Sequence, residues 1–466
     1  MRPSLTTDGH RDAVAAPVPG VVLVFSTAGA RAVPMRLCDG ALDIGRADTP
    51  GGIDGKLEDG RVSRRHARIA LDGGRFTVTD LGSQNGTFVD GERLPVNGSR
   101  AAGRVIRVGD SLLVTVRDVR PLEERGVRVV DGFVRGPEMQ ELLDEAARAA
   151  DGGGTLHVRG ETGTGKEGVA QAFHRRSSHA AGRFVPVNCA AIPQNLAERL
   201  LFGARRGAYS GAERDADGYI QEADGGTLFL DEIAELDAGV QAKLLRTIES
   251  REVMQLGASR PSKSDFQLCS ATNKDLRVLV AAGALREDLY FRVGRPLVTV
   301  PALRNRPEEI ALLVGEELER VAPTLAAHVS LVEQCLLRPW PGNVRELIVE
   351  VRAAAQAAAA DGSTRVQARH LAASAGSAFG GATAPATAAT VASEDAAERA
   401  PRKRAPLVDD EWKQRIEEAL RKHGGNVTAS ARELGLHRTQ LRRLLERHGI
   451  AAGPDDGDDD DPKPDV

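Results

Sequence analysis

The segment Gly160-Glu161-Thr162-Gly163-Thr164-Gly165-Lys166 lies between an apolar run at 155–158 and a helix-compatible run at 167–176. A glycine-rich turn between a strand and a helix lets backbone N–H groups converge on phosphate oxygens, and the lysine then reaches the β- and γ-phosphates. Glu167 stands where the general pattern has Ser or Thr, so the usual hydroxyl ligand of Mg²⁺ is missing. The alternative, a flexible turn that binds nothing, fits this strand–loop–helix context poorly.

A second segment supplies the partner that such a loop needs. Residues 225–232 read Gly-Gly-Thr-Leu-Phe-Leu-Asp-Glu, a short apolar run that ends in two carboxylates. The run is typical of a strand buried on both faces. Asp231 is placed to hold Mg²⁺, directly or through water, and Glu232 is placed to polarise the attacking water. Alone, the pair would only mark a strand leaving the core, but after a phosphate loop it predicts nucleotide hydrolysis.

Size and composition bound the class of protein. The chain has 466 residues, enough for roughly three domains, and a net charge of −4 that says little about partners. Its four cysteines lie far apart without a Cys-x-x-Cys pair, which argues against a disulfide framework or a zinc ribbon. Neither a membrane-spanning run nor a signal-peptide pattern is found. We therefore expect a soluble, cytoplasmic protein that does not contact the membrane.

The pattern of the chain predicts a multidomain fold. Short strands at 21–25, 41–44, 67–70, 76–80 and 112–116, separated by turns, predict an N-terminal β-sandwich. Alternating helices and buried strands then predict an α/β layer, followed by a helical lid and an all-α C-terminal domain. The expected ranges are a disordered tail at 1–18, the sandwich at 19–120, the α/β subdomain at 129–305, its lid at 306–371, a flexible linker at 372–407, the all-α domain at 408–450 and an acidic tail at 451–466. That last tail is most simply solvated, and the sharper alternative is that it competes with DNA for the basic segment before it.

Further motifs follow the phosphate loop in a characteristic order. They are Gly207-Ala208-Tyr209-Ser210-Gly211-Ala212, Ala271-Thr272-Asn273-Lys274-Asp275-Leu276, the run 285–292, Val300-Pro301-Ala302-Leu303-Arg304 and Trp340-Pro341-Gly342-Asn343-Val344-Arg345-Glu346-Leu347. Over about half of the chain, 129–371, this set resembles the AAA+ domain of sigma-54-dependent enhancer-binding transcription activators. Glu after the loop lysine is usual in that family.

The resemblance implies a role for each matching position. ATP would bind to the loop and to the lid arginine: Gly160, Glu161, Thr162, Gly163, Thr164, Gly165, Lys166, Glu167 and Arg345. Asp231 would hold Mg²⁺, Glu232 would activate water, Asn188 would restrain Glu232, and Asn273 would sense the γ-phosphate. Arg286 and Arg292 match arginines that reach the neighbouring subunit's nucleotide, where a guanidinium suits the spreading negative charge. The alternative for Arg286 is a surface salt bridge with Glu287 or Asp288, and Arg292 could likewise be structural.

The family touches the sigma factor through a loop that here spans Gly207, Ala208, Tyr209, Ser210, Gly211 and Ala212. Tyr209 replaces the family's Phe and Ser210 replaces its Thr, so an aromatic ring and a hydroxyl are kept. The lost methyl would weaken a packing contact by about 1 kcal/mol. These departures are compatible with ATP hydrolysis, and they bear on the strength of the loop's contact with its target and on the identity of that target.

The N-terminal strands carry a second resemblance. Ile44-Gly45-Arg46, Ser63-Arg64-Arg65-His66 and Ser83-Gln84-Asn85-Gly86-Thr87 lie on predicted loops and resemble the forkhead-associated (FHA) domain, which reads phosphothreonine. Arg46, Ser63 and Arg64 would bind the phosphate, and Asn85 would hold the peptide backbone. His66 is expected to brace the Ser63 loop. The partner would be a phosphothreonine protein or a Ser/Thr kinase, and the alternative is a sandwich that has lost binding.

The C-terminal pattern predicts a DNA reader. Helices are expected at 412–423, 427–434 and 437–448, with Gly424-Gly425 ending the first and Asn426 capping the second. The tight turn between the last two resembles the Fis-type helix-turn-helix. Leu441, Leu444 and Leu445 are expected in its core. The residues expected to contact DNA are Arg438, Thr439, Gln440, Arg442 and Arg443.

Together these patterns and resemblances predict an ATPase that binds upstream double-stranded DNA as a dimer, assembles into a hexamer and remodels sigma-54 RNA polymerase, gated in a two-component-like manner by a phosphopeptide. Two alternatives stay open. One is an AAA+ DNA-binding regulator that does not engage sigma-54. The other is a non-enzymatic adaptor that joins a phosphoprotein to DNA.

Overall fold

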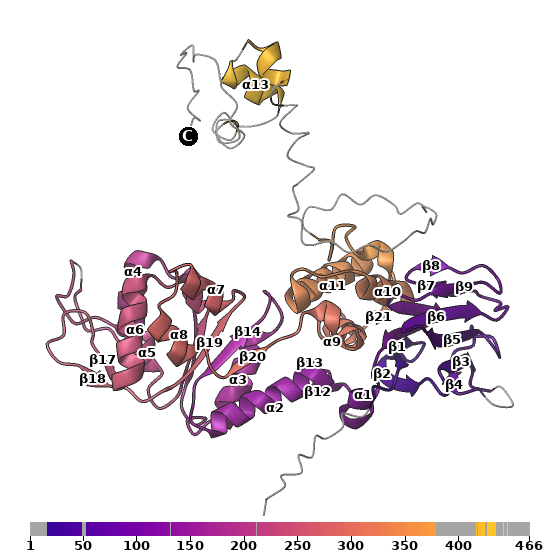
Figure 1. Ribbon diagram of the computed structural model, residues 1–466, viewed down its shortest axis with the longest axis horizontal. Coiled ribbons are helices and arrows are strands. Elements are labelled where there is room, and N and C mark those ends of the chain that lie inside the picture. The colour runs from indigo at the N-terminus through magenta and orange to yellow at the C-terminus, as the bar shows by residue number, and fades with distance from the viewer. Residues whose placement is uncertain are drawn as a thin grey trace, which may run out of the picture. The chain divides into compact units, whose positions relative to one another are not determined.

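The computed structural model describes residues 16–48, 53–130, 132–210, 212–378, 416, 418–424, 426–434, 441 and 445. The chain divides into two compact units, Met1–Thr383 and Ala384–Val466 (Figure 1). The first unit holds the sandwich, the α/β subdomain and the lid, and the second holds the C-terminal helices. Each unit is described by itself.

The N-terminal residues form a sandwich of two sheets, with strand orders β2-β1-β11-β10-β7-β8 and β4-β3-β5-β6-β9. All five predicted strands are confirmed, each within a slightly longer strand. The bounds are β1 Gly20–Ser26, β2 Gly29–Arg36, β3 Ala41–Arg46, β4 Gly55–Leu57, β5 Ala67–Asp72, β6 Arg75–Asp80, β7 Thr87–Val89, β8 Glu92–Arg93, β9 Ser99–Ala101, β10 Val105–Val108 and β11 Ser111–Val116. Helix α1 (Arg120–Arg125) and the hairpin β12 (Arg128–Val130) and β13 (Phe133–Arg135) lead out of it.

The α/β subdomain is built on a parallel sheet with the order β15-β16-β19-β14-β20. Alternate residues of its strands enter two separate cores, as a strand buried on both faces requires. Phe229 packs with α2 and α3, whereas Leu228 and Leu230 pack with helices of the other face. The strands are β14 Leu156–Arg159, β15 Phe184–Asn188, β16 Thr227–Asp231, β19 Gln267–Thr272 and β20 Leu297–Thr299; the helices are α2 Pro137–Asp151, α3 Lys166–Arg176, α4 Gln194–Phe202, α5 Tyr219–Glu222, α6 Ala238–Ser250, α7 Leu276–Ala281 and α8 Glu287–Val293; a hairpin joins β17 Glu252–Val253 and β18 Ser262–Lys263.

The helical lid follows the sheet. It contains α9 (Ile310–Val321), α10 (Val329–Leu337) and α11 (Asn343–Ala360), with short strands β21 (Ala326–Ala327) and β22 (Arg365–Val366). Trp340 is fully buried at its centre. The linker was predicted from 372, but 372–378 pack on the lid, because Ala375 enters its apolar core and Gly376 lies against the Trp340 ring.

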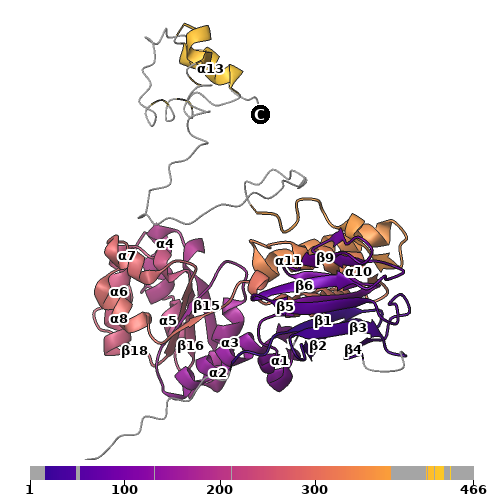
Figure 2. The same cartoon turned by 45° about the vertical axis from the view of Figure 1, so that its right-hand side comes forward.

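The sandwich and the lid share one apolar core. Strand β1 is buried along its whole length. Val21 and Leu23 face the sandwich interior, whereas Val22 and Val24 pack with lid residues such as Val314. Helix α9 contacts β1 and β2, and α10 contacts β1, β10 and β11. In both Figure 1 and Figure 2 the orange helices of the lid lie beside the indigo strands of the sandwich.

In the second unit, α13 (Val427–Glu433) confirms the predicted middle helix. Gly424 adopts a positive φ of 59° where the preceding helix ends, and the Asn426 side chain accepts a hydrogen bond from the Ala429 N–H, so both predicted capping features are confirmed. Leu441 and Leu445 join the small core, as predicted, with Ile416, Leu420, Val427 and Ala431. Leu444, also predicted in this core, lies outside the described residues. Across the part of the chain that the structure describes, no helix is long and apolar enough to cross a membrane.

Candidate functional site

The glycine-rich loop connects β14 to α3, as predicted, and its conformation depends on glycine at two positions. Gly163 has φ +78°, and a Cβ there would lie 2.1 Å from the carbonyl oxygen of Gly342 in the lid. Gly165 has φ +100° and caps the N-terminus of α3. The loop therefore opens a helix N-terminus toward the cleft, with the partial positive charge that favours phosphate.

Lys166 and the two carboxylates meet beside this loop. The Lys166 ammonium is nearly buried, donates to the Gly160 carbonyl at 3.1 Å and lies 3.8 Å from Oε1 of Glu232. Asp231 ends β16, and burial raises the pKa of its carboxyl against the opposing effect of Lys166. Glu232 follows with φ 52°, and its Oε2 accepts from the Thr272 hydroxyl at 3.0 Å.

The two predicted asparagines lie at the same edge of the sheet. Asn188 is the register partner of Asp231 on the neighbouring strand, but its side-chain oxygen accepts from the Ala190 N–H rather than contacting Glu232. The backbone N–H of Asn273 lies 3.4 Å from Oε2 of Glu232. The fold thus gathers both asparagines near the carboxylate pair and joins only Asn273 directly to Glu232 through a hydrogen bond.

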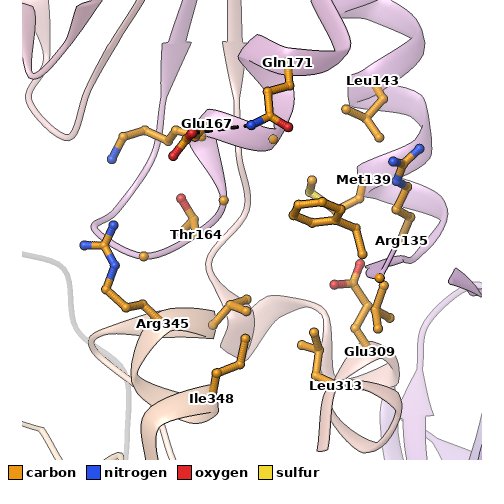
Figure 3. A pocket seen from close by; sticks show the side chains of 18 of the residues that line it. Arg135, Met139, Leu143, Thr164, Glu167, Gln171, Glu309, Leu313, Arg345 and Ile348 are labelled. Carbon is orange, nitrogen blue, oxygen red and sulfur yellow. Dashed lines mark hydrogen bonds between the residues drawn. The ribbon is translucent and has the colours of Figure 1, made fainter. Parts of the chain in front are cut away.

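A cavity of about 420 Å³ extends from the loop toward the lid. Figure 3 shows Met139 and Leu143 of α2 on one side of it, Leu313 and Ile348 of the lid on another, and Arg345 turned toward the loop. One end of the cavity is therefore apolar and the other carries Gly163–Lys166. Arg345 was predicted from the sequence, but the apolar lining was not, because these residues look like ordinary core residues in each separate element and only the fold brings them together.

Three residues for which the sequence predicted no role hold the loop from outside. The Arg304 guanidinium contacts both carboxylate oxygens of Glu161, at 2.6 and 2.9 Å, and this pairing lowers the pKa of Glu161. Buried Asn343 donates to Glu161 and to the Thr162 carbonyl. Arg306, also buried, donates to the Thr164 carbonyl at 2.8 Å. Arg304 lies in the motif 300–304, Asn343 lies in the motif 340–347, and Arg306 lies two residues beyond the first. Nothing else in the sequence indicates that they contact the loop.

Arg286 and Arg292 do not line this cavity. Arg286 pairs with Asp288 at 2.7 Å, the surface salt bridge foreseen as its alternative role, and Arg292 contacts Glu249 at 3.4 Å. Both guanidinium groups are about half exposed, next to the exposed ring of Phe291. Within one subunit, the fold keeps both arginines away from Lys166 and presents them on another face.

The 207–212 loop projects from the segment between α4 and α5. The Gly207 N–H donates to the Ala212 carbonyl and closes the loop. The Tyr209 ring is partly exposed, and its hydroxyl accepts from Arg199 at 3.0 Å. Ser210 is exposed, and Gly211 lies outside the described residues.

The sandwich brings together the residues predicted to bind a phosphopeptide. The Arg46 N–H donates to the Ser63 carbonyl, and the Arg46 guanidinium lies 2.6 Å from Asp48. The Ser63 hydroxyl accepts from Gln84, next to Asn85, and Arg64 is exposed beside it.

His66 braces this cluster, as predicted. Buried His66 accepts from the Ser63 N–H at 3.0 Å through Nδ1, while Nε2 lies 3.2 Å from the Gly86 carbonyl. Asn85 is fixed by donating to the Arg61 carbonyl at 2.6 Å. The loops that carry the predicted peptide-binding residues are thus held together at one end of the sandwich.

The residues predicted to contact DNA, Arg438, Thr439, Gln440, Arg442 and Arg443, lie outside the described residues.

The fold and the site together define a multidomain protein with an N-terminal sandwich, a central P-loop AAA+ domain with a parallel sheet and a helical lid, and a C-terminal helical domain.

Comparisons with known proteins agree. Family models match as Sigma-54 interaction domain at 133–298, FHA domain at 42–112 and Bacterial regulatory protein, Fis family at 413–448. The transcriptional regulatory protein ZraR of Escherichia coli (strain K12) is 37% identical over 318 residues, 67% of this chain and 68% of that protein. The chain therefore belongs to the family of sigma-54-dependent transcriptional regulators.

Two further proteins are similar to this chain. The nitric oxide reductase transcription regulator NorR2 of Cupriavidus necator is 39% identical over 331 residues, 66% of this chain and 61% of that protein. The crystal structure of NtrX from Brucella abortus is 27% identical, covers 71% of each chain and has a TM-score of 0.49. The FHA domain stands at the N-terminus of this chain and the Fis-type domain at its C-terminus.

Proposed function

We propose that this protein is an ATP-driven activator that binds upstream DNA and remodels RNA polymerase carrying sigma-54, under the control of a phosphopeptide bound to its FHA domain. The observation that carries the proposal is the placement of Lys166 Nζ 3.8 Å from Oε1 of Glu232, beside a glycine-rich loop at the mouth of a cavity. A cation for phosphate and a base for water meet there, which is what nucleotide hydrolysis needs.

The cavity fits ATP in one direction. The base would lie at the apolar end between α2 and the lid, and the phosphates would lie on the 160–166 loop, near Arg345. Asp231 would hold Mg²⁺, which neutralises charge on the phosphates when bound. The half-buried Asp231 carboxyl, with its raised pKa, fits a cation that would compensate its negative charge.

Hydrolysis would be completed at an interface between subunits. Glu232 would take a proton from the attacking water, and Asn273 would report the γ-phosphate through its hydrogen bond to Glu232. Arg286 and Arg292, exposed and outside their own cavity, would reach the nucleotide of the next subunit in a hexamer. Activity would then depend on assembly.

The 207–212 loop, the helix-turn-helix and the FHA domain would connect ATP hydrolysis to its target, to DNA and to a regulatory peptide. The exposed 207–212 loop would engage sigma-54 and move with the nucleotide state. The helix-turn-helix would bind upstream DNA as a dimer, and Arg46, Ser63, Arg64 and Asn85 would hold a phosphothreonine peptide.

The first experiment measures ATP hydrolysis by the full-length protein on DNA that carries its binding site. Lys166→Ala should abolish it, whereas Lys263→Ala, at an exposed position in β18, should leave it near the wild-type rate. Equal rates for wild type and Lys166→Ala would support the adaptor without enzymatic activity.

The second experiment is transcription in vitro with sigma-54 polymerase. Ser210→Ala should reduce open-promoter formation while ATP hydrolysis continues, and Ser178→Ala, an exposed serine after α3, should not. Transcription that ignores sigma-54 altogether would favour the rival regulator.

The FHA site has its own test. Arg46→Ala should lose binding to a phosphothreonine peptide library, and Arg100→Ala, at an exposed ion pair with Glu92, should keep it. Promoter output that is unchanged by Arg46→Ala under all kinase conditions would contradict phosphopeptide control.

A further inference from the structure

The lid-facing surface of the FHA sandwich has the composition of a core. An antiparallel sheet normally leaves one face to solvent and alternates apolar with polar residues. In β1 and β11 both sets are apolar: Val21, Leu23 and Leu113 face the sandwich interior, whereas Val22, Val24, Leu112 and Val114 face the lid. A sandwich joined to the rest of the chain only by a flexible linker would not need these lid-facing apolar residues.

An ion pair lies at the edge of the contact between the sandwich and the lid. Arg107 of β10 lies with its guanidinium carbon 3.5 Å from the centre of the Phe88 ring, and its Nε lies 2.9 Å from Oε2 of Glu333 in α10. The Glu333 side chain is only 9% exposed. Gly315 of α9 comes close to Ala30 of β2, where an added Cβ would lie 3.5 Å away. Apolar packing and a desolvated ion pair therefore fix one arrangement of the two domains.

One side chain extends from this contact to the phosphate loop. Arg104, in the turn between β9 and β10, donates from Nη2 to the backbone carbonyl of Arg304 at 2.6 Å. The Arg304 guanidinium in turn holds both carboxylate oxygens of Glu161, a residue of the loop. Two contacts thus separate the FHA domain from the loop proposed to bind phosphate.

The turn that carries Arg104 is itself rigid. The Asp90 carboxylate accepts backbone hydrogen bonds from Gly103, Arg104 and Val105 at 2.8, 2.9 and 2.9 Å. Arg104 is half-buried, and burial lowers its pKa against the opposing effect of the nearby Glu308 carboxylate. The Arg104 side chain therefore has a fixed position between this turn and Arg304, because hydrogen bonds constrain both its backbone N–H and its guanidinium.

We infer that the FHA domain is a structural part of the nucleotide site and that Arg104 is a positioning residue, which holds Arg304 and through it Glu161 and the phosphate loop. The inference rests on the proposed function, since it concerns the loop proposed to bind ATP. It identifies a route by which a change at the FHA domain reaches the nucleotide, without requiring the two domains to separate.

The test uses the full-length protein in two measurements. The first is amide hydrogen exchange of residues 160–165 without nucleotide. Arg104→Ala should speed exchange in this segment about fivefold, the effect of losing one hydrogen bond. Arg100→Ala, in β9 at an exposed ion pair with Glu92, is the matched control and should leave it unchanged. Arg104→Lys, which keeps a long cationic donor, should recover most of the protection.

The second measurement is steady-state ATP hydrolysis. Arg104→Ala should raise KM for ATP about fivefold and change kcat little, because Asp231 and Glu232 are untouched. Exchange of 160–165 that is equal in wild type and Arg104→Ala, or equally fast in Arg100→Ala and Arg104→Ala, overturns the inference. Because exchange is measured without nucleotide, this result is distinct from a wild-type protein that hydrolyses no ATP, which would overturn the proposed function.

Discussion

Arg107 of the FHA sandwich and Glu333 of the lid form an ion pair across the domain boundary, with Nε 3.0 and 2.9 Å from the two carboxylate oxygens. The two residues are 226 positions apart in the sequence. Their contact shows that the FHA sandwich and the lid pack against each other within the first unit of the chain. Several expectations depend on that packing.

The ion pair should contribute measurably to stability. Glu333→Ala leaves the Arg107 charge partly buried without its partner and should lower the free energy of unfolding by about 2 kcal/mol. Fluorescence of buried Trp340 would report the transition in a Trp412→Phe background. Glu319→Ala, at an exposed position of α9, should change stability by less than about 0.5 kcal/mol. Equal effects of the two substitutions would show that the pair is not stabilising.

Glu308, next to this boundary, should make stability depend on pH. Burial raises its pKa from 4.5 to about 7. The unfolded chain then releases this proton at lower pH than the folded protein, so stability falls as pH rises from about 4.5 to about 7, by on the order of 3 kcal/mol.

Glu308→Gln removes this titration and should flatten the decline, which urea unfolding at several pH values would measure. Part of the slope should remain, because burial also raises the pKa of Glu309. Glu319→Gln serves as the exposed control. A decline that is as steep in Glu308→Gln as in wild type would contradict the assignment.

His66 should give the opposite dependence at the phosphopeptide site. Burial lowers its pKa, and its neutral Nδ1 accepts the Ser63 N–H. Below about 6.5, the ordinary pKa of histidine, the unfolded chain binds a proton that folded His66 resists, so folding stability should fall as pH falls. Peptide affinity should fall as the folded His66 itself becomes protonated, because Nδ1 then no longer accepts the Ser63 N–H.

The peptide's own phosphate also titrates near pH 6. His66→Gln, which keeps an acceptor and a donor but does not titrate, therefore provides the comparison. Peptide affinity should fall more steeply in wild type than in His66→Gln between pH 7.5 and pH 5.5. Parallel curves would remove His66 from the explanation.

The arginines on the outer face can be assigned by mixing variants. Arg286→Ala and Lys166→Ala should each be nearly inactive in ATP hydrolysis, whereas their equal mixture should recover on the order of a quarter of the wild-type rate. The recovery arises because an intact site then meets an intact arginine at about one interface in four.

The control replaces Lys166→Ala by the double variant Lys166→Ala/Arg286→Ala, which supplies no arginine and should restore nothing. If Arg286→Ala alone kept full activity, Arg286 would serve only its salt bridge with Asp288.

Local motifs could be predicted from the sequence because they depend on neighbouring residues. The phosphate loop between β14 and α3, the apolar β16 ending in Asp231, and the turn signals of the sandwich each need only a few adjacent positions. His66 could be assigned its bracing role for the same reason, since it reaches Ser63 only three residues away.

The contacts by which Arg304, Asn343 and Arg306 hold the glycine-rich loop could not be derived from neighbouring residues. Asn343 contacts Glu161, and Arg306 contacts Thr164, across more than 140 positions, so nothing near either residue indicates its partner. The same holds for the apolar lining of the cavity, which the helices α2, α9 and α11 and the strand β13 supply.

By itself, the sequence determined which segments form the glycine-rich loop, the strands and the turns, because backbone conformation and period follow from short stretches of side chains. Residues 21–25 are apolar at every position, but the sequence predicted only a sandwich strand there, without its burial on both faces. Only the tertiary structure decided that the lid covers the second face, and that Arg104 thereby meets Arg304. The physical reason is that apolar burial is non-directional: a strand specifies that it must be covered, whereas the long-range packing of the whole chain specifies by what.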